Sequence, residues 1–281
     1  MTIIKGISDL QENVNFLKNN GKTIGFVPTM GALHDGHVSL IAASKAENDI
    51  TVCSIFVNPT QFNDPKDFEK YPVTIEADIE KLELAGTNIL FLPSVNEMYP
   101  DGFDKVPHYE LGFIETILEG KYRPGHFQGV CQIVHKLLLA VQPHNLYMGQ
   151  KDYQQCMVIN KLIQIEHLET KLHTRSTLRE KDGLAMSSRN MRLNEEERKN
   201  ALTIYRVLNY LKDHIEKESI PYLLDRSNLM LTDNNFLPDY VSIADAETLA
   251  PVENWDGHQK IVALIAAYQN EVRLIDNMVL D

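Results

Sequence analysis

Two histidines, His34 and His37, lie three residues apart in the stretch P-T-M-G-A-L-H-D-G-H, residues 28–37, beside two glycines. An apolar segment at residues 23–27 precedes this stretch, and a helix is expected to begin near Gly36. The N–H groups and partial positive charge at a helix N-terminus favour phosphate, and imidazoles there could donate hydrogen bonds to phosphoryl oxygens. The spacing alone leaves a phosphate site, structural histidines and a metal site open, although the H-E-x-x-H pattern of helical zinc sites is absent.

Amides and one lysine follow two other predicted strands. The segment F-V-N-P-T-Q-F carries Asn58 and Gln61, whose amides suit the hydroxyl and carboxylate groups of a ligand or belong to a proline-driven turn. The segment G-Q-K-D-Y-Q-Q carries Lys151, which could reach phosphates as a point charge, and Gln155, one turn into the next helix. A plain helix-capping sequence is an equally open interpretation of this second segment.

Two further loops could hold anions. The segment L-A-M-S-S-R-N, residues 184–190, combines two hydroxyls with an arginine and would suit the β- and γ-phosphates of a nucleotide. On its own it also fits a solvated loop. In K-Y-R-P-G-H-F-Q-G-V, residues 121–130, either Arg123 or His126 could hold an anion, and a flexible surface loop is equally compatible.

The elements that must position these motifs alternate between strands and helices. Strands are predicted at residues 23–27, 50–57, 88–92, 145–148 and 171–174, and helices at residues 36–45, 75–84, 130–141 and 153–163. Apolar strands alternating with helices indicate a parallel sheet covered on both faces. The expected fold class is α/β, a Rossmann-like doubly wound parallel sheet that binds ligands at the carboxyl ends of its strands.

The pattern changes after residue 177. Asn194 is expected to cap a helix that runs to about residue 215, and short β-rich segments follow at residues 239–243, 260–268 and 272–276. We therefore expect two domains: a Rossmann-like catalytic domain at residues 1–177 and a smaller α+β domain at residues 178–281.

Composition excludes several classes of protein. The 281 residues are 43% hydrophobic and 23% charged, as in globular proteins, and the formal net charge of −12 argues against a nucleic-acid partner. Neither a signal peptide nor an apolar stretch long enough to cross a bilayer is visible, so we expect a soluble, cytoplasmic protein without a membrane partner. The single cysteines Cys53, Cys131 and Cys156 are expected to be buried free thiols.

Taken together, the motifs resemble a known family. The His34–His37 stretch resembles the H-x-G-H signature of the superfamily of nucleotidylyltransferases and class I aminoacyl-tRNA synthetases, and M-S-S-R resembles its K-M-S-K-S-like signature. Three segments narrow the match: F-V-N-P-T-Q-F, G-Q-K-D-Y-Q-Q and R-E-K-D-G-L-A-M-S-S-R-N. With them, the chain resembles the pantothenate synthetase (pantoate–β-alanine ligase) family over about residues 25–192. The chain departs from the family at Val73, where arginine is common, and at Ala77, where some members carry a second acid beside Asp78.

The resemblance implies an activity and its ligands. The family joins pantoate to β-alanine through a pantoyl adenylate, while ATP becomes AMP and pyrophosphate. Magnesium is expected to enter on the ATP phosphates, with Asp78 as the one candidate for a direct protein ligand, and the family suggests a homodimer. The C-terminal domain is expected to close over the site, because an acyl adenylate must be kept from water.

The resemblance also implies the site residues, which fall into three groups. The catalytic residues are His37, which corresponds to the residue usually assigned as the proton donor, with His34, Lys151 and Arg189. Pantoate is expected at Gln61 and Gln155, and β-alanine at Gln61. ATP is expected along Met30, Gly31, Ala32, Leu33, His34, Asp35, Gly36 and His37, along Gly149, Gln150, Lys151 and Asp152, and at Leu178, Met186, Ser187, Ser188 and Arg189.

Three other functions compete with this one. A nucleotidylyltransferase of the same superfamily would transfer a nucleotide to a phosphate and stop there. An aminoacyl-tRNA synthetase is disfavoured by the acidic charge and by the lack of a basic anticodon-reading domain. A non-catalytic nucleotide sensor would leave the two amides and the separate phosphate clamps unexplained.

Overall fold

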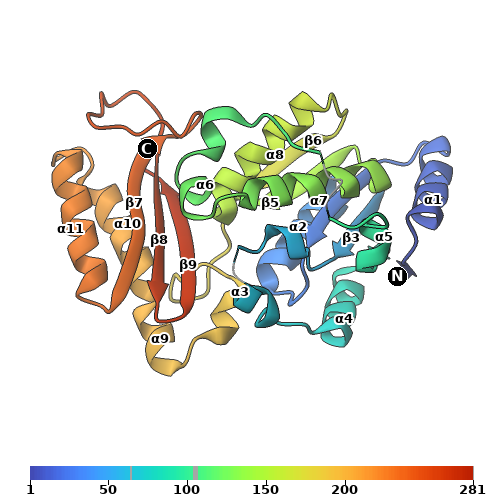
Figure 1. The fold of residues 1–281 in the computed structure, drawn as a ribbon, viewed down its shortest axis with the longest axis horizontal. Helices are drawn as coiled ribbons and strands as arrows, with labels where there is room; N and C mark the ends of the chain where they lie inside the picture. Colours follow the sequence, from blue (N-terminus) through green and yellow to red (C-terminus); the bar gives the residue numbers. More distant parts are fainter. Residues whose placement is uncertain (64, 104–106, 281) are drawn as a thin grey trace. The chain divides into compact units, whose positions relative to one another are not determined.

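The computed structural model describes residues 1–63, 65–103 and 107–280, and the chain divides into two compact units (Figure 1). The N-terminal unit comprises Met1–Gly149 and Gln155–Ser176, and the C-terminal unit comprises Gln150–Gln154 and Thr177–Asp281. A five-residue segment that contains Lys151 therefore groups with the C-terminal unit, although it lies between two elements of the N-terminal unit in sequence.

The N-terminal unit is built on a six-stranded sheet in which every neighbouring pair is parallel. In spatial order its strands are β1 (Thr2–Ile4), β4 (Ile89–Phe91), β3 (Ile50–Ile55), β2 (Ile24–Thr29), β5 (Asn145–Gly149) and β6 (Lys171–Arg175). The chain runs from β2 to β3 on one side and later to β5 on the other, so the strand order reverses beside β2. Ligand crevices of open α/β sheets form at such a point, and the predicted fold class is confirmed.

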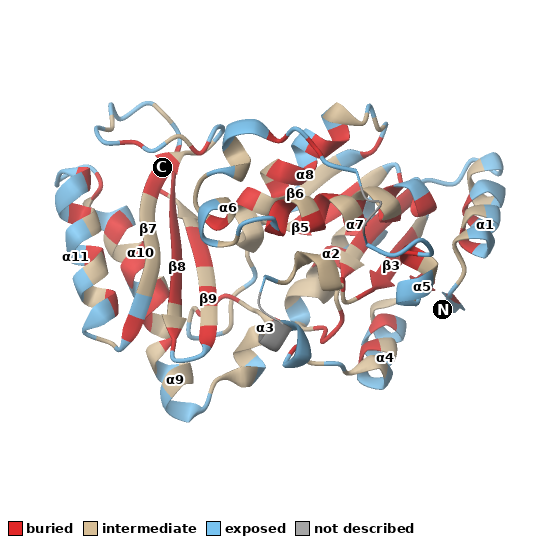
Figure 2. Ribbon diagram, viewed as in Figure 1, coloured by how far each residue is buried: buried red, intermediate tan, exposed pale blue. Residues whose placement is uncertain are grey.

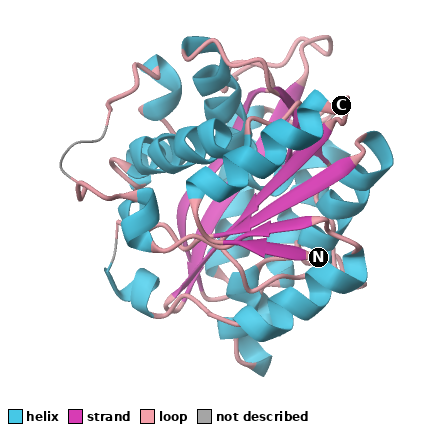
Figure 3. Ribbon diagram, turned by 90° about the vertical axis from the view of Figure 1, so that its right-hand side faces the viewer, coloured by secondary structure: helices cyan, strands magenta, loops and turns pink. Residues whose placement is uncertain are grey.

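Both faces of this sheet are covered, as the apolar strands predict (Figure 3). The longer helices are α1 (Ile7–Asn19), α2 (Asp35–Glu47), α4 (Ile75–Ala85), α7 (His126–Val141) and α8 (Tyr153–Ile165). The shorter ones are α3 (Pro65–Glu69), α5 (Val95–Met98) and α6 (Glu119–Tyr122), with the 3-10 turns η1 (Pro59–Gln61), η2 (Gly112–Glu115) and η3 (Gln150–Asp152).

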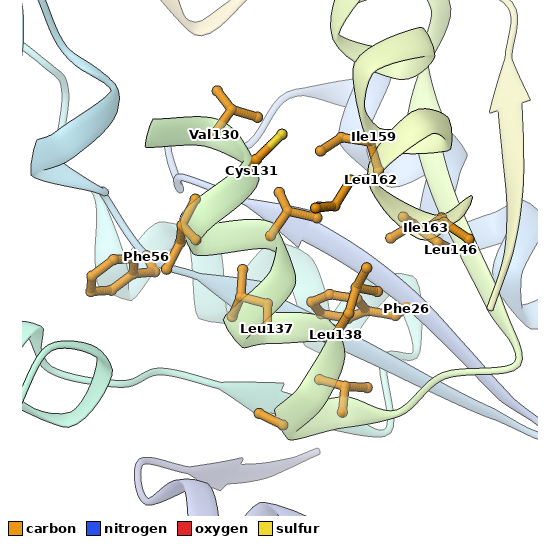
Figure 4. Packing of buried hydrophobic residues seen from close by; sticks show 14 of the residues in the cluster. Phe26, Phe56, Val130, Cys131, Leu137, Leu138, Leu146, Ile159, Leu162 and Ile163 are labelled. Carbon is orange, nitrogen blue, oxygen red and sulfur yellow. The ribbon is translucent and has the colours of Figure 1, made fainter. Parts of the chain in front are cut away.

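Successive residues of β2 point to opposite faces of the sheet. Phe26 belongs to the apolar cluster formed with α1, α7 and α8, where it lies near Leu138 of α7 (Figure 4). Its neighbour Val27 belongs to a second cluster, formed with α2 and α4, that includes Ile41 and Leu82. The alternation of strand side chains therefore gives this unit a core on each side of the sheet.

The C-terminal unit pairs an antiparallel sheet with three helices. Its strands are β7 (Phe236–Asp245), β8 (Ile261–Gln269) and β9 (Val272–Val279), and its helices are α9 (Glu195–Asn200), α10 (Leu202–His214) and α11 (Ile220–Thr232), with the 3-10 turn η4 (Ser188–Arg192). The central strand β8 is almost wholly buried (Figure 2). This is the smaller α+β architecture expected from the sequence.

Several elements of the structure were not predicted. They are the edge strand β1, helices α1 and α11, and the short helices α3, α5 and α6. The expected cap at Asn194 and the helix end near residue 215 are confirmed, but the expectation of one continuous helix is wrong: the segment is divided into α9 and α10, which meet at the fully buried Ala201. In the described residues 1–63, 65–103 and 107–280, no helix has the length and hydropathy that crossing a bilayer requires.

Candidate active site

The loop between β2 and α2 is held by a buried carboxylate. Asp78, in the first turn of α4, is fully buried, and its two oxygens accept the backbone N–H groups of Ala32 at 2.8 Å and Leu33 at 2.7 Å. The Thr74 hydroxyl donates to the same carboxylate at 3.1 Å. Gly31, with a φ of +81°, lies so close that an added Cβ would stand 3.1 Å from Asp78 Oδ2. Asp78 therefore fixes the course of this loop.

This geometry bears on the expected role of Asp78 as a magnesium ligand. Its two oxygens accept hydrogen bonds from the loop, so a metal would have to compete with backbone N–H groups for both of them. Among the residues that the structure describes, no group of three or more His, Cys, Asp or Glu side chains is arranged to hold a metal ion. The arrangement supports a structural task for Asp78, namely to position the loop.

The two histidines lie at the N-terminus of α2. His34 is the N-cap residue, His37 lies in the first turn, and their ring centroids are 4.0 Å apart. The backbone N–H of His34 donates to Nδ1 of His37 at 3.3 Å. Because Nδ1 accepts, the neutral His37 ring carries its hydrogen on Nε2 and can donate it. The helix terminus and this tautomer together suit a developing negative charge.

Gln61, in the turn η1 after β3, lies beside the β2 loop. Its Nε2 donates to the sulfur of Met30 at 3.0 Å, so the loops that follow β2 and β3 meet in space. Asn58 is fully buried; its Nδ2 donates to the carbonyl of Gly129 at 3.1 Å, and its Oδ1 accepts the hydroxyl of Tyr99 at 2.8 Å. The buried Asn58 therefore stabilises the turn η1, whereas the amide of Gln61 is partly exposed.

Arg123 and His126 hold the backbone of Gln61. His126 Nδ1 lies 2.8 Å from the Gln61 carbonyl oxygen, and Arg123 Nη2 donates to the same oxygen at 3.4 Å. Arg123 Nη1 lies 3.0 Å from His126 Nε2, and since a guanidinium can only donate, Nε2 accepts and Nδ1 donates to Gln61. The loop that could have been a flexible surface segment therefore positions Gln61, a role that sequence spacing did not reveal.

Lys151 and the M-S-S-R segment meet in a pocket of the C-terminal unit. Its polar lining is formed by Lys151, Ser187, Arg189, Asn190, Arg273 and Asp276. Ser187 is the N-cap residue of η4, where its hydroxyl accepts the N–H of Arg189 at 3.3 Å. Three cationic side chains and a hydroxyl in one pocket form an environment suited to a polyanion such as pyrophosphate.

Three acids lie beside these cations. Asp239 pairs with Arg273 at 2.7 Å and Asp152 with Lys151 at 3.3 Å, and Asp276 itself lines the pocket. The Asp276 carboxylate accepts bidentate hydrogen bonds from Arg179 at 2.6 and 3.1 Å. Burial raises the pKa of Asp276, while hydrogen bonding and the charge of Arg179 act in the opposite direction. Arg179 also lies over the ring of Tyr205, 4.6 Å from its centroid. The bidentate geometry and the stacking favour an ionised pair, so the charge of Asp276 is balanced by Arg179.

The remaining residues expected at the site are also divided between the N-terminal and the C-terminal unit. Leu178 and Met186 lie together in the C-terminal unit, where the Met186 N–H donates to the Leu178 carbonyl at 3.0 Å. Gly149 ends β5 of the N-terminal unit, and Gln155 lies in the first turn of α8. The structure thus gathers Met30–His37 with Gln61 in one unit, and Lys151, Leu178 and Met186–Arg189 in the other.

The family model of pantoate–β-alanine ligase matches residues 2–279, nearly the whole chain. The chain belongs to the pantoate–β-alanine ligase family. The pantothenate synthetase of Bacteroides fragilis is 43% identical over 99% of this chain and 98% of its own length. That of Acetivibrio thermocellus is 44% identical over the full length of both chains.

Solved structures of this ligase family agree with the assignment. The crystal structure of pantothenate synthetase from Thermus thermophilus has a TM-score of 0.92 and 38% identity, covering 100% of this chain and 99% of the other. A pantoate–β-alanine ligase from Francisella tularensis, complexed with β-γ ATP and β-alanine, has a TM-score of 0.81 and 37% identity over 100% of this chain and 98% of that one. The expected family is therefore confirmed.

Proposed function

We propose that this chain condenses pantoate with β-alanine to pantothenate at the expense of ATP, through a pantoyl adenylate. The observation that supports the proposal is that Lys151 lines the same pocket as Ser187 and Arg189, which follow it much later in the sequence. Full-length family membership and the relative's complex with β-γ ATP and β-alanine support the choice of substrates.

The first step is an in-line displacement at phosphorus. A carboxylate oxygen of pantoate attacks the α-phosphorus of ATP, the bond from that phosphorus to the bridging oxygen breaks, and pyrophosphate leaves. Both reactants are anionic, so positioning and charge neutralisation are the main tasks of the protein. His34, His37 and the α2 N-terminus serve the α-phosphate with Lys151, while Ser187, Ser188 and Arg189 hold the leaving pyrophosphate.

The second step is acyl transfer. The neutral amine of β-alanine attacks the activated carbonyl carbon, the carbon–oxygen bond to the phosphate breaks, and AMP leaves while the nitrogen loses a proton. Gln61 binds pantoate and β-alanine, and Gln155 binds pantoate. Because Arg123 and His126 fix the Gln61 backbone, the amide can act without reorganising.

Magnesium, the lid motion and the assembly belong to the proposal as well. Mg²⁺ would accompany the ATP phosphates and neutralise their charge, which needs few protein ligands and agrees with the hydrogen-bonded state of Asp78. The domain that begins near residue 178 would close over the site and keep water from the adenylate. A homodimer and a cytoplasmic location stay predictions from the family resemblance and from the sequence.

Product analysis tests the function against its nearest rival. The purified chain is incubated with ATP, magnesium and pantoate, and β-alanine is added later. We expect AMP and pantothenate to accumulate in equal amounts, and only after the amine is added. Continuous turnover to a nucleotidylated phosphate product that needs no amine would instead identify a nucleotidylyltransferase.

A further inference from the structure

The segment that contains Lys151 is attached to the last strand of the chain. Asn277 of β9 donates both hydrogens of its amide, one to the carbonyl of Gln150 at 2.9 Å and one to the carbonyl of Lys151 at 2.8 Å. Its Oδ1 lies 3.4 Å from Nε2 of Gln150. A single planar amide thus holds two successive peptide groups, one on each side of the Lys151 Cα.

Asn277 is itself fixed in place. It is 3% exposed, its backbone N–H donates to Asp276 Oδ1 at 2.8 Å, and its carbonyl accepts Arg179 Nη2 at 3.3 Å. The Asp276–Arg179 ion pair therefore holds the backbone of the asparagine, while the asparagine amide holds the lysine segment. A second attachment follows two residues later, where the Tyr153 hydroxyl donates to the Ala246 carbonyl at 2.6 Å.

The choice of asparagine has a chemical reason. Two carbonyl oxygens point at the same group, so that group must donate twice, and a carboxylate of the same shape can donate nothing and would repel both oxygens. Lysine has four flexible side-chain carbons, so the position of its ammonium depends on how well the backbone at its base is fixed. Fixing the two peptide groups sets the direction of the Lys151 Cα–Cβ bond.

We propose that Asn277 is a positioning residue that aims Lys151 into the phosphate pocket and makes the lysine part of the C-terminal unit. In sequence Lys151 follows a strand of the parallel sheet, yet its backbone is bound to β9. The inference rests on the proposed function, because it assigns Lys151 to the nucleotide phosphates. Whatever motion the C-terminal unit makes, Lys151 makes with it.

A double-mutant cycle on Asn277→Asp and Lys151→Ala tests this. The readout is the rate constant of pantoate-dependent exchange of labelled pyrophosphate into ATP at saturating substrates, with the KM for ATP measured alongside. We expect Lys151→Ala to lower the rate constant by about 10²- to 10³-fold and Asn277→Asp by about 10- to 100-fold. If Asn277 acts through Lys151, the double variant falls no more than about threefold below Lys151→Ala.

The outcomes distinguish a failure of the positioning role of Asn277 from a failure of the proposed phosphate-binding role of Lys151. Losses that multiply in the double variant, or an Asn277→Asp rate within threefold of the unaltered chain while Lys151→Ala is impaired, overturn the positioning role. A Lys151→Ala rate within threefold of the unaltered chain removes Lys151 from the proposed phosphate clamp, and the inference falls with it.

Two further variants keep the result interpretable. Asn228→Asp is the matched control, because its amide donates to the Leu224 carbonyl at 2.9 Å inside α11, and we expect its exchange rate to be unchanged. Thermal unfolding by circular dichroism reports whether each variant is folded. If Asn277→Asp does not fold, Asn277→Ala takes its place in the same cycle, since it removes both donors without adding charge, and the same criteria apply.

Discussion

The backbone N–H of Leu33 donates to the carboxylate of Asp78 at 2.7 Å, across 45 residues of sequence. This bond and its partner at Ala32 join the first turn of α4 to the loop that leads into the two histidines. The loop includes two residues with positive φ, Gly31 and Ala32, so its course needs support from outside. Asp78 supplies that support from a fully buried position.

Replacing Asp78 with asparagine should weaken ATP use without changing the dependence on magnesium. The amide keeps the shape but can place only one oxygen toward two N–H groups, and an unsatisfied buried donor costs about 1–3 kcal/mol of stability. We expect a lower melting temperature and a loss of about tenfold or more in kcat/KM for ATP. Glu76→Gln, an exposed acid in the same helical turn, is the control. A rise in the magnesium concentration needed for half-maximal rate would instead assign Asp78 to the metal.

Removing the imidazole of His126 should raise the KM for pantoate. Its Nδ1 lies 2.8 Å from the carbonyl oxygen of Gln61, so His126→Ala frees the substrate-binding amide to move. We expect the KM for pantoate to rise about tenfold, the cost of roughly one well-placed hydrogen bond, with a smaller change in the KM for ATP. Steady-state kinetics with each substrate varied check this, and the exposed His108→Ala is the control. Equal KM values in the variant and the unaltered chain would contradict the positioning of Gln61.

Stability should fall at low pH because of Asp49. Hydrogen bonds from the backbone and hydroxyl of Thr23, then from Lys22, lower the pKa of Asp49 from 3.8 to about 2. A carboxyl with a lowered pKa in the folded state stabilises that state above its unfolded pKa and loses the effect as the pH falls through its folded pKa. The urea midpoint of the unaltered chain should therefore exceed that of Asp49→Asn at pH 6, and the difference should shrink between about pH 4 and pH 2. A difference that is constant over this range would contradict the assignment.

The three cysteines should be unreactive in the folded protein. All are buried free thiols, and burial raises the pKa of both Cys53 and Cys131 to about 12. Because the thiolate is the reactive species, a disulfide reagent at pH 8 should modify the native chain slowly and all three thiols rapidly in denaturant. Fast labelling of Cys53 or Cys131 in the native chain would show that the core opens more readily than this packing indicates.

The sequence predicted those parts of the fold that depend on local pattern. Strands β2 to β5 were found because their apolar residues fill both faces of a sheet, as Phe26 and Val27 do. The edge strand β6, with the sequence KLHTR, has no buried residue, and it was found from its place in the alternation of strands and helices. The three-residue strand β1 is too short to show a period, and no predicted element covered α1 or α11, although Leu10 and Val14 lie four residues apart on the buried side of α1.

The site was predictable only as a set of motifs. His34, His37, Gln61 and Lys151 carry recognisable chemistry, so their residue types and order along the chain were informative. Asp78 and Asn277 act through contacts to backbone atoms 46 and 126 residues away, which no local pattern encodes. Hence the groups expected to touch the nucleotide were named from the sequence, whereas the positioning roles of Asp78 and Asn277 came from the structure.

The most direct test of the adenylate mechanism is the exchange of labelled pyrophosphate into ATP by the unaltered chain. The reversal of the first step requires pantoate, and it does not require β-alanine. We predict rapid exchange with ATP, magnesium and pantoate, and none when pantoate is left out. Active, folded protein that makes pantothenate but shows no pantoate-dependent exchange would contradict the pantoyl adenylate.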